Sequence, residues 1–130
     1  MPRNCNSLEE FKKYREKMNR KILGSGNLQI QRFFNLDARA YHEGALSSKV
    51  KELLGLVASL VLRCDDCVTY HVLRCVEEGV SDAEFFEAFN VSLVAGGSIT
   101  IPHLRRAVER LEECRTLEKR HLSRRVYGRR

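Results

Sequence analysis

Two cysteines and a histidine lie close together in the middle of this 130-residue sequence, in the segment Cys64-Asp65-Asp66-Cys67-Val68-Thr69-Tyr70-His71. Cys64 and Cys67, called the CxxC pair below, are three residues apart and share one face if the segment is helical. This spacing suits a disulfide. A position at the start of a helix favours the thiolate, because unpaired backbone N–H groups lie there. Asp65 and Asp66 oppose it by raising the thiol pKa, and the sequence leaves open which effect is larger.

His71 and Glu52 are the candidates for moving protons at this pair. His71 lies four residues after Cys67 on the same helical face, where an imidazole can transfer a proton to or from the thiol. Glu52 is the acidic residue of an otherwise almost wholly apolar segment. In an antiparallel helical hairpin, Glu52 would lie about 18 Å back from Cys64, and His71 about 10 Å forward. We therefore expect Glu52 to meet His71, and we predict a relay in the order Glu52, His71, Cys67.

Other interpretations of these residues stay open. The two thiols, His71 and Glu52 could ligate zinc, although structural zinc sites usually draw on two separated ligand pairs. The thiols could instead be a buried pair beside a core histidine, and Glu52 a carboxylate that favours a helix start. We favour redox chemistry, and we predict neither a metal nor a cofactor.

Helical periodicity and capping signals run through nearly the whole chain, so we predict an all-α fold of about six helices. Ser7 and Ser81 begin capping boxes, Ser47 or Ser48 caps the third helix, and Pro102 can start the sixth. The apolar stripe of the third helix predicts a central helix that is buried on most sides; its members are Val50, Leu53, Leu54, Val57, Leu60 and Val61. The predicted helices cover about 8–23, 28–43, 48–61, 65–78, 82–95 and 103–122, with a tail at 123–130 that is frayed or ordered only by contacts.

Length and composition predict a single domain over residues 1–130, since 43% of the residues are hydrophobic. The longest apolar run, residues 53–62, is about half of the roughly 20 residues that a membrane span needs. The first residues lack the apolar core of a secretory signal, and the five cysteines are an odd number. We therefore expect a cytoplasmic protein without membrane contact.

The formal net charge of +6 belongs to one end of the chain. Residues 1–102 carry 13 basic and 13 acidic side chains, whereas residues 103–130 carry 10 and 4. Opposite charges three or four residues apart in this segment are typical of a solvated helix. Aromatic residues between the charges are nearly absent, so we do not expect nucleic-acid binding.

The pattern Glu52-x11-Cys64-x2-Cys67-x3-His71 resembles the signature of the alkylhydroperoxidase D-like, carboxymuconolactone decarboxylase superfamily. Further similar segments are Gly44-Ala45-Leu46-Ser47, Gly79-Val80-Ser81 and Ala95-Gly96-Gly97. The resemblance covers residues 34–111, about three fifths of the chain. It implies a helical domain that assembles as a homo-trimer or homo-hexamer.

The resemblance also implies a thiol-dependent peroxidase. Cys67 would attack the peroxide, Cys64 would resolve the resulting sulfenic acid as a disulfide, and Glu52 and His71 would relay protons. A dithiol or lipoyl-type protein reductant would then reduce the disulfide. Asp66 stands where the peroxidase branch has a histidine, which bears on the efficiency of the relay. The alternative is the non-redox activity of the decarboxylase branch, acting on a small lactone acid, which does not depend on a CxxC pair.

Overall fold

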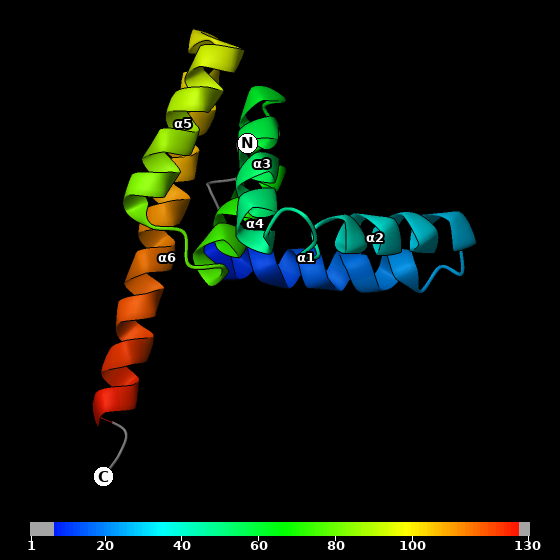
Figure 1. Ribbon diagram of the computed structural model, residues 1–130. Coiled ribbons are helices and arrows are strands. Elements are labelled where there is room, and N and C mark those ends of the chain that lie inside the picture. Colours follow the sequence, from blue (N-terminus) through cyan, green and yellow to red (C-terminus); the bar gives the residue numbers. More distant parts are fainter. Residues whose placement is uncertain (1–6, 128–130) are drawn as a thin grey trace, which may run out of the picture. The chain divides into compact units, whose positions relative to one another are not determined.

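Helices account for nearly all of the computed structural model, which describes residues 7–127 and their side chains as far as Leu122 (Figure 1). The prediction of an all-α chain with about six helices is confirmed for these residues. The elements are α1 (Leu8–Leu23), α2 (Leu28–Ala40), α3 (Ser48–Val61), α4 (Asp65–Glu77), α5 (Asp82–Gly96), a short 3-10 helix η1 (Ser98–Thr100) and α6 (Ile101–Tyr127). None of the described helices is both long and apolar enough to cross a membrane.

Serine side chains begin three of the helices as their spacing predicts. The hydroxyl oxygens of Ser7, Ser47 and Ser81 each accept a hydrogen bond from the backbone N–H three residues later. At Ser81 the capping box is complete, because Glu84 accepts from the Ser81 backbone N–H at 3.0 Å. That bond, with the neighbouring Lys49 ammonium, lowers the pKa of Glu84 to about 2. Local sequence signals therefore set the starts of α1, α3 and α5.

Two helix ends differ from the prediction. The second helix ends at Ala40 rather than Glu43, because the backbone N–H of Tyr41 bonds to the Arg39 carbonyl and the chain turns before Gly44. The sixth helix continues to Tyr127 rather than ending near Leu122. Residues 128–130 of the predicted tail lie outside the described residues.

The chain divides into two compact units, Met1–His42 and Glu43–Arg130. In the first unit α1 and α2 form a hairpin, and they lie side by side in Figure 1. The turn at residues 24–27 ends with Asn27, whose Oδ1 accepts from the N–H groups of Gln29 and Ile30. Glycine and asparagine thus provide the reversal that the sequence predicts.

In the second unit α3 packs against α4 and α5, and α4 packs against α6. The turn between α5 and η1 uses Gly97, whose φ of 78° favours glycine. The two largest fully buried side chains of the core are Phe85 and Phe89 of α5. The other apolar core residues of this unit are Leu56, Leu60, Val68, Val72, Cys75, Val80, Ala107, Leu111 and Cys114.

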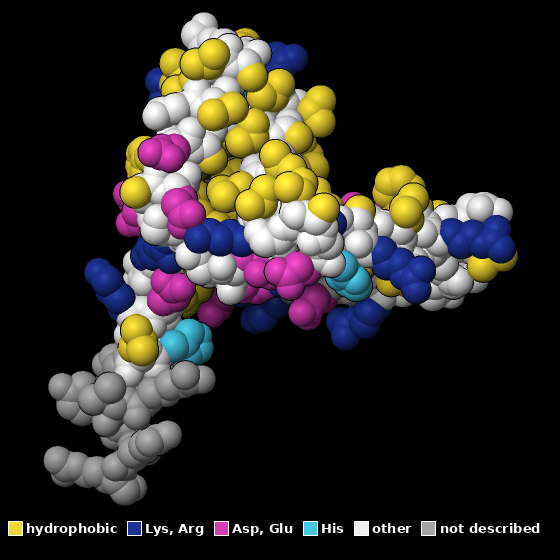
Figure 2. Space-filling view, viewed as in Figure 1, with side chains coloured by type: hydrophobic (Ala, Val, Ile, Leu, Met, Phe, Trp, Pro, Cys, Tyr) yellow, Lys and Arg dark blue, Asp and Glu magenta, His cyan; other side chains and the backbone are white. Residues whose placement is uncertain are grey.

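The buried face of α3 is not the apolar stripe that the sequence predicts. Val50 and Leu54 are 40% and 55% exposed, whereas Glu52, Leu56 and Ser59 are buried. Polar residues can occupy the buried face because each has a partner; the Ser59 hydroxyl, for example, donates to the Gly55 carbonyl at 2.7 Å. The prediction that α3 is buried on most sides is confirmed, because its exposed residues are confined to one stripe of Val50, Leu54 and Ala58. Figure 2 shows hydrophobic side chains gathered at the surface over α3 and α5.

The basic sixth helix carries the short-range ion pairs that its charge pattern predicts. Arg110 pairs with Glu113 at 2.7 Å, and Arg115 pairs with Glu118 at 3.1 Å. Arg110 is nevertheless only 8% exposed. This helix therefore buries part of its charged face instead of being solvated all round.

Candidate active site

A tight connection between α3 and α4 places the first cysteine. The N–H of Arg63 bonds to the Leu60 carbonyl at 3.1 Å, and the N–H of Cys64 bonds to the Ser59 carbonyl at 3.1 Å. These two bonds form a Schellman motif, with Arg63 at the position that glycine usually occupies. Arg63 has a φ of 59°, a conformation that costs about 1 kcal/mol for a residue other than glycine. The end of α3 and the first cysteine are thus fixed by the same hydrogen bonds.

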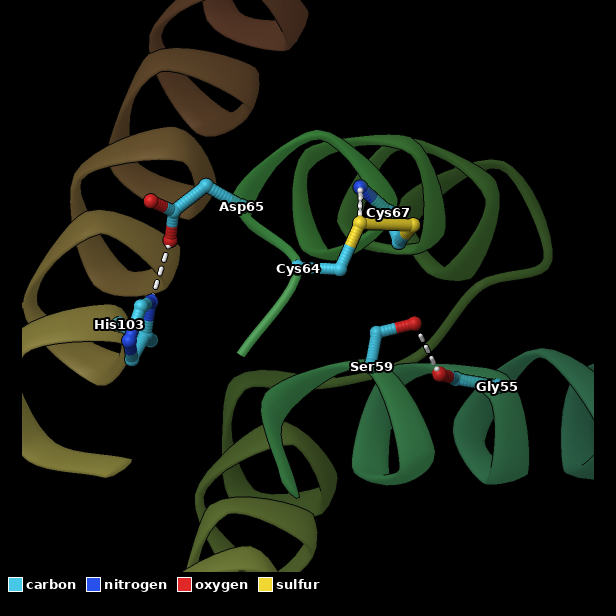
Figure 3. The surroundings of a disulfide bond; sticks show 6 residues. All are labelled: Gly55, Ser59, Cys64, Asp65, Cys67 and His103. Atoms are coloured by element: carbon cyan, nitrogen blue, oxygen red, sulfur yellow. Dashed lines mark hydrogen bonds and ion pairs between the residues drawn. A yellow bond between two sulfur atoms is a disulfide. The ribbon is translucent and has the colours of Figure 1, made fainter. Parts of the chain in front are cut away.

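The CxxC pair lies at the N-terminus of α4, and a disulfide joins its two sulfur atoms, with the Cα atoms 5.2 Å apart. Cys64 caps the helix, and its Sγ accepts from the Cys67 N–H at 3.3 Å (Figure 3). Cys67 is exposed and Cys64 is partly exposed. The pair therefore lies at the accessible, positively polarised end of a helix, in its oxidised form.

Glu52 and His71 meet behind this pair, inside the unit. Nδ1 of His71 donates to Oε2 of Glu52 at 2.9 Å, and the two residues are 7% and 1% exposed. A buried carboxylate needs such a partner, because its transfer out of water is costly. Since an ionised carboxylate only accepts, we assign the hydrogen to Nδ1, which leaves Nε2 as the basic nitrogen. His71 lies one helical turn from Cys67 on α4, as the relay requires.

Gly55 makes room for the imidazole, a role that the motif search missed. A Cβ atom at position 55 would lie 2.5 Å from Cε1 of His71, 2.8 Å from Nε2 and 2.9 Å from Nδ1. These distances are far below a carbon–carbon contact of about 3.5–4.0 Å. A glycine in the middle of a buried helix, three residues after Glu52, was the available sequence signal.

Arg74 is a second residue that sequence reasoning missed. Its Nε lies 3.5 Å from Oε1 of Glu52, so the carboxylate faces His71 on one side and a guanidinium on the other. Partial burial alone would lower the pKa of Arg74, but Glu77 and Glu52 outweigh this effect and the net pKa is raised. The position of Arg74 three residues after His71 was the available signal.

The remaining described cysteines are enclosed. Cys75 is a free thiol, and Cys75 and Cys114 are both buried. Burial, together with Glu52 and Glu78, raises the pKa of Cys75 to about 12, so this thiol stays protonated at neutral pH. Cys5 lies outside the described residues. Among the described cysteines, those that solvent reaches are therefore the two of the CxxC pair.

Two further residues lie near the site. Tyr70 lies beside His71 with its ring edge-on, at 5.2 Å between ring centroids. His103 is partly buried and bonds to Asp65. In residues 7–127, no group of three or more His, Cys, Asp or Glu side chains is arranged to hold a metal ion.

Comparisons with known proteins extend this description. Two crystal structures of one protein from Thermotoga maritima align with TM-scores of 0.84 and 0.83, at 58% and 57% identity. Each alignment covers 86% of this chain, and they cover 98% and 95% of the other chains. That protein is described as a carboxymuconolactone decarboxylase family protein, and an involvement in the antioxidative response has been suggested for it.

A more distant structure shows the same fold. A carboxymuconolactone decarboxylase family protein from Legionella pneumophila aligns with a TM-score of 0.76 at 23% identity, over 82% of this chain and 95% of that one. Comparison with curated proteins finds no significant match. The sequence model of the Carboxymuconolactone decarboxylase family matches residues 30–110, which include the CxxC pair, Glu52 and His71. The chain therefore belongs to the carboxymuconolactone decarboxylase family.

Proposed function

We propose that this protein is a thiol-dependent hydroperoxidase in which the CxxC pair is the redox centre. The observation that carries the proposal is the buried Glu52–His71 hydrogen bond, one helical turn behind the exposed Cys67. A nucleophile, a base and a group that orients the base are the parts of an activated thiol site. The antioxidative role suggested for the Thermotoga maritima relative, at 57% identity, supports the same interpretation.

The first half of the cycle oxidises Cys67. The Cys67 thiol gives its proton to the His71 relay, its thiolate attacks the terminal oxygen of the hydroperoxide, and the O–O bond breaks. The leaving alkoxide takes a proton from the His71 relay and departs as an alcohol. Cys67 is left as a sulfenic acid, oxidised by two electrons. Glu52 keeps the imidazole oriented and stabilises its protonated form.

The second half closes and reopens the disulfide. Sγ of Cys64 attacks the sulfenic sulfur, hydroxide leaves and takes up a proton, and water is released. The described structure has the disulfide that this step forms. A dithiol or lipoyl-type protein reductant then returns two electrons and two protons by thiol–disulfide exchange. We place this cycle in the cytoplasm, where such reductants keep thiols reduced.

The decisive experiment is turnover of an organic hydroperoxide with a dithiol reductant. We expect Cys67→Ser to abolish turnover. Cys64→Ser should abolish turnover while still forming a sulfenic acid in a single reaction with peroxide, detected by mass spectrometry. Cys75→Ser is the matched control, since that thiol is buried and protonated, and we expect it to keep turnover. Activity that survives Cys67→Ser would overturn the proposal.

A second candidate is a non-redox reaction on a small lactone acid. The description of the matching family names such a decarboxylase activity. That reaction would proceed with both cysteines replaced. Decarboxylation of a lactone acid by the Cys64→Ser/Cys67→Ser double variant, at the wild-type rate, would favour this candidate over the peroxidase.

We also propose that the protein assembles as a homo-trimer or homo-hexamer. Exposed apolar side chains on α3 and α5 support it; they include Leu54, Val91 and Val94, which are 55%, 57% and 89% exposed. A surface of this kind is typical of an association site. Light scattering coupled to size exclusion measures the mass. We expect Leu54→Glu to shift it toward the 15.0 kDa monomer, and a wild-type mass of one chain would contradict assembly.

A further inference from the structure

Asp65 directly follows Cys64 in the sequence, yet its carboxylate is held by a different helix. His103 Nδ1 donates to Oδ1 of Asp65 at 2.7 Å, and Arg106 Nη1 donates to Oδ2 at 2.8 Å. Both donors lie at the start of α6, about 40 residues further along the chain, and are called the α6 clamp below. Figure 3 shows the Asp65 side chain pointing away from the disulfide and toward His103.

The charge of Asp65 matters because this residue is next to Cys64 in the chain and lies in the first turn of the helix that carries the CxxC pair. A nearby negative charge disfavours a thiolate, whereas the N-terminus of a helix favours one. Asp65 and Asp66 both belong to the first turn of α4 and would together oppose the helix terminus. The clamp occupies both oxygens of Asp65 and sets the positive charge of Arg106 against it. Asp66 is exposed on the same turn.

The stability that such a contact gives the fold is modest. The Asp65 and Arg106 side chains are 41% and 50% exposed, and ion pairs of this exposure contribute little to folding stability. The charges of Asp65 and Arg106 have a small electrostatic effect on the CxxC pair as well, but this effect changes the thiol pKa of the reactive residues directly. A unit charge roughly a Debye length (about 10 Å) from a thiolate, in a water-like dielectric, changes the thiol pKa by about 0.3 unit.

We propose that His103 and Arg106 are positioning residues for the CxxC pair. They hold the Asp65 carboxylate away from the sulfur atoms and offset its charge, so that the reduced pair forms thiolates more readily. The inference deepens the proposed function, because it assumes that this pair acts as thiolates. It resolves the conflict between the helix terminus and the two aspartates in favour of the helix terminus.

The test measures the reduced thiols and requires no turnover. Rates of iodoacetamide alkylation of Cys64 and Cys67, followed by mass spectrometry from pH 5 to 10, give the thiol pKa. We expect Arg106→Gln to raise it by roughly 0.3 unit. Arg106→Lys, which keeps the charge, should stay within about 0.2 unit of wild type. Arg105→Gln is the matched control, because it removes an exposed cation of α6 from the neighbouring position.

Asp65→Asn decides whether Arg106 acts through the carboxylate. In the Asp65→Asn background, Arg106→Gln should shift the thiol pKa by less than half as much as in wild type. An equal shift in both backgrounds, or an equal shift from Arg105→Gln, would overturn the clamp and indicate a general field of the basic helix. Circular dichroism of each variant establishes that it is folded.

The clamp and the proposed function fail in different ways. A protein with the expected pKa shifts but no hydroperoxide turnover would refute the peroxidase and retain the clamp. A protein that turns over hydroperoxide and shows no pKa difference between Arg106→Gln and Arg105→Gln would refute the clamp alone.

Discussion

Replacing Gly55 by alanine is the sharpest test of how the buried relay is built. Alanine is ordinarily the better helix residue, and the exchange in a helix interior gains about 1 kcal/mol. At this position the new Cβ would lie 2.5–2.9 Å from three ring atoms of His71. The ring would have to retreat by about 1 Å to restore a normal carbon contact. The Nδ1···Oε2 distance to Glu52, now 2.9 Å, would then exceed the roughly 3.2 Å limit of a good hydrogen bond.

The expected loss of stability follows from these opposing terms. Forcing an extra methyl into a packed core costs about 1–3 kcal/mol. Losing a buried hydrogen bond to a charged group costs about 1.5–3 kcal/mol more. Against the gain of about 1 kcal/mol in helix propensity, Gly55→Ala should be destabilised by about 2 kcal/mol or more. For a chain of this size the melting temperature should fall by roughly 6 °C or more.

The assay combines a stability curve with turnover. Urea unfolding gives the free energy, and hydroperoxide turnover with a dithiol at 25 °C gives the rate of the still-folded variant. We expect a loss of about ten- to a hundredfold in rate, because general acid–base catalysis usually contributes a hundredfold or more. Ala58→Gly, at an exposed position of the same helix, is the control. This substitution should lower the free energy of unfolding by about 1 kcal/mol and leave the rate of hydroperoxide turnover unchanged.

One result would refute the reasoning about Gly55. If Gly55→Ala were about 1 kcal/mol more stable than wild type, as at an ordinary helix position, the imidazole would not be packed on this glycine. Unchanged turnover in that variant would further show that the Glu52–His71 contact does not depend on the space that Gly55 leaves.

Three further outcomes follow from the structure. Arg63→Gly should relieve the strained φ of 59° and raise stability by about 0.5 kcal/mol. Gly79→Ala, at the matching position after α4 with a φ of 80°, should lower it by about 1 kcal/mol in the same thermal melts. A loss of stability in Arg63→Gly, or a gain in Gly79→Ala, would contradict the assigned strain. Cys75 has a pKa raised by burial from 9.0 to about 12, so above pH 9 the unfolded chain releases this proton and the folded chain retains it. Stability should therefore be fully present below pH 9 and fall between pH 9 and 12, and urea titrations of Cys75→Ala should show a smaller fall; an equal fall would exclude this thiol as the cause. Deleting residues 123–130 should leave hydroperoxide turnover within about twofold, because the described site includes none of them; loss of turnover in a folded truncation would place the tail in the site.

Helix starts could be predicted because their signals are local. A serine hydroxyl reaches the backbone N–H three residues later on the same turn, so the caps at Ser47 and Ser81 depend on a few adjacent residues. The ends were harder to predict. The second helix ends before Gly44, and the sixth continues beyond its predicted end at Leu122. A helix end has fewer strict requirements than a start, so a glycine several residues away is a weaker signal.

The buried face of α3 could not be predicted from its hydropathy. The most apolar stripe includes Leu54, which is 55% exposed, while the face that packs in the unit carries Glu52 at 1% exposure. Hydropathy assigns a cost to a buried carboxylate as if it were unpaired. It contains no information on His71 and Arg74, which supply the compensating contacts from another helix.

By itself, the sequence determined the helical fold class and the face of α4 that carries the CxxC pair and His71, because helical spacing along one segment fixes both. Tertiary structure decided which side of α3 faces that helix, where Gly55 leaves space for the imidazole, and that α6 supplies the partners of Asp65. The physical reason is the separation along the sequence between the residues that make each contact. Contacts between residues 3 or 4 apart follow from helix geometry, whereas contacts between residues 19, 38 and 41 apart depend on how whole helices pack.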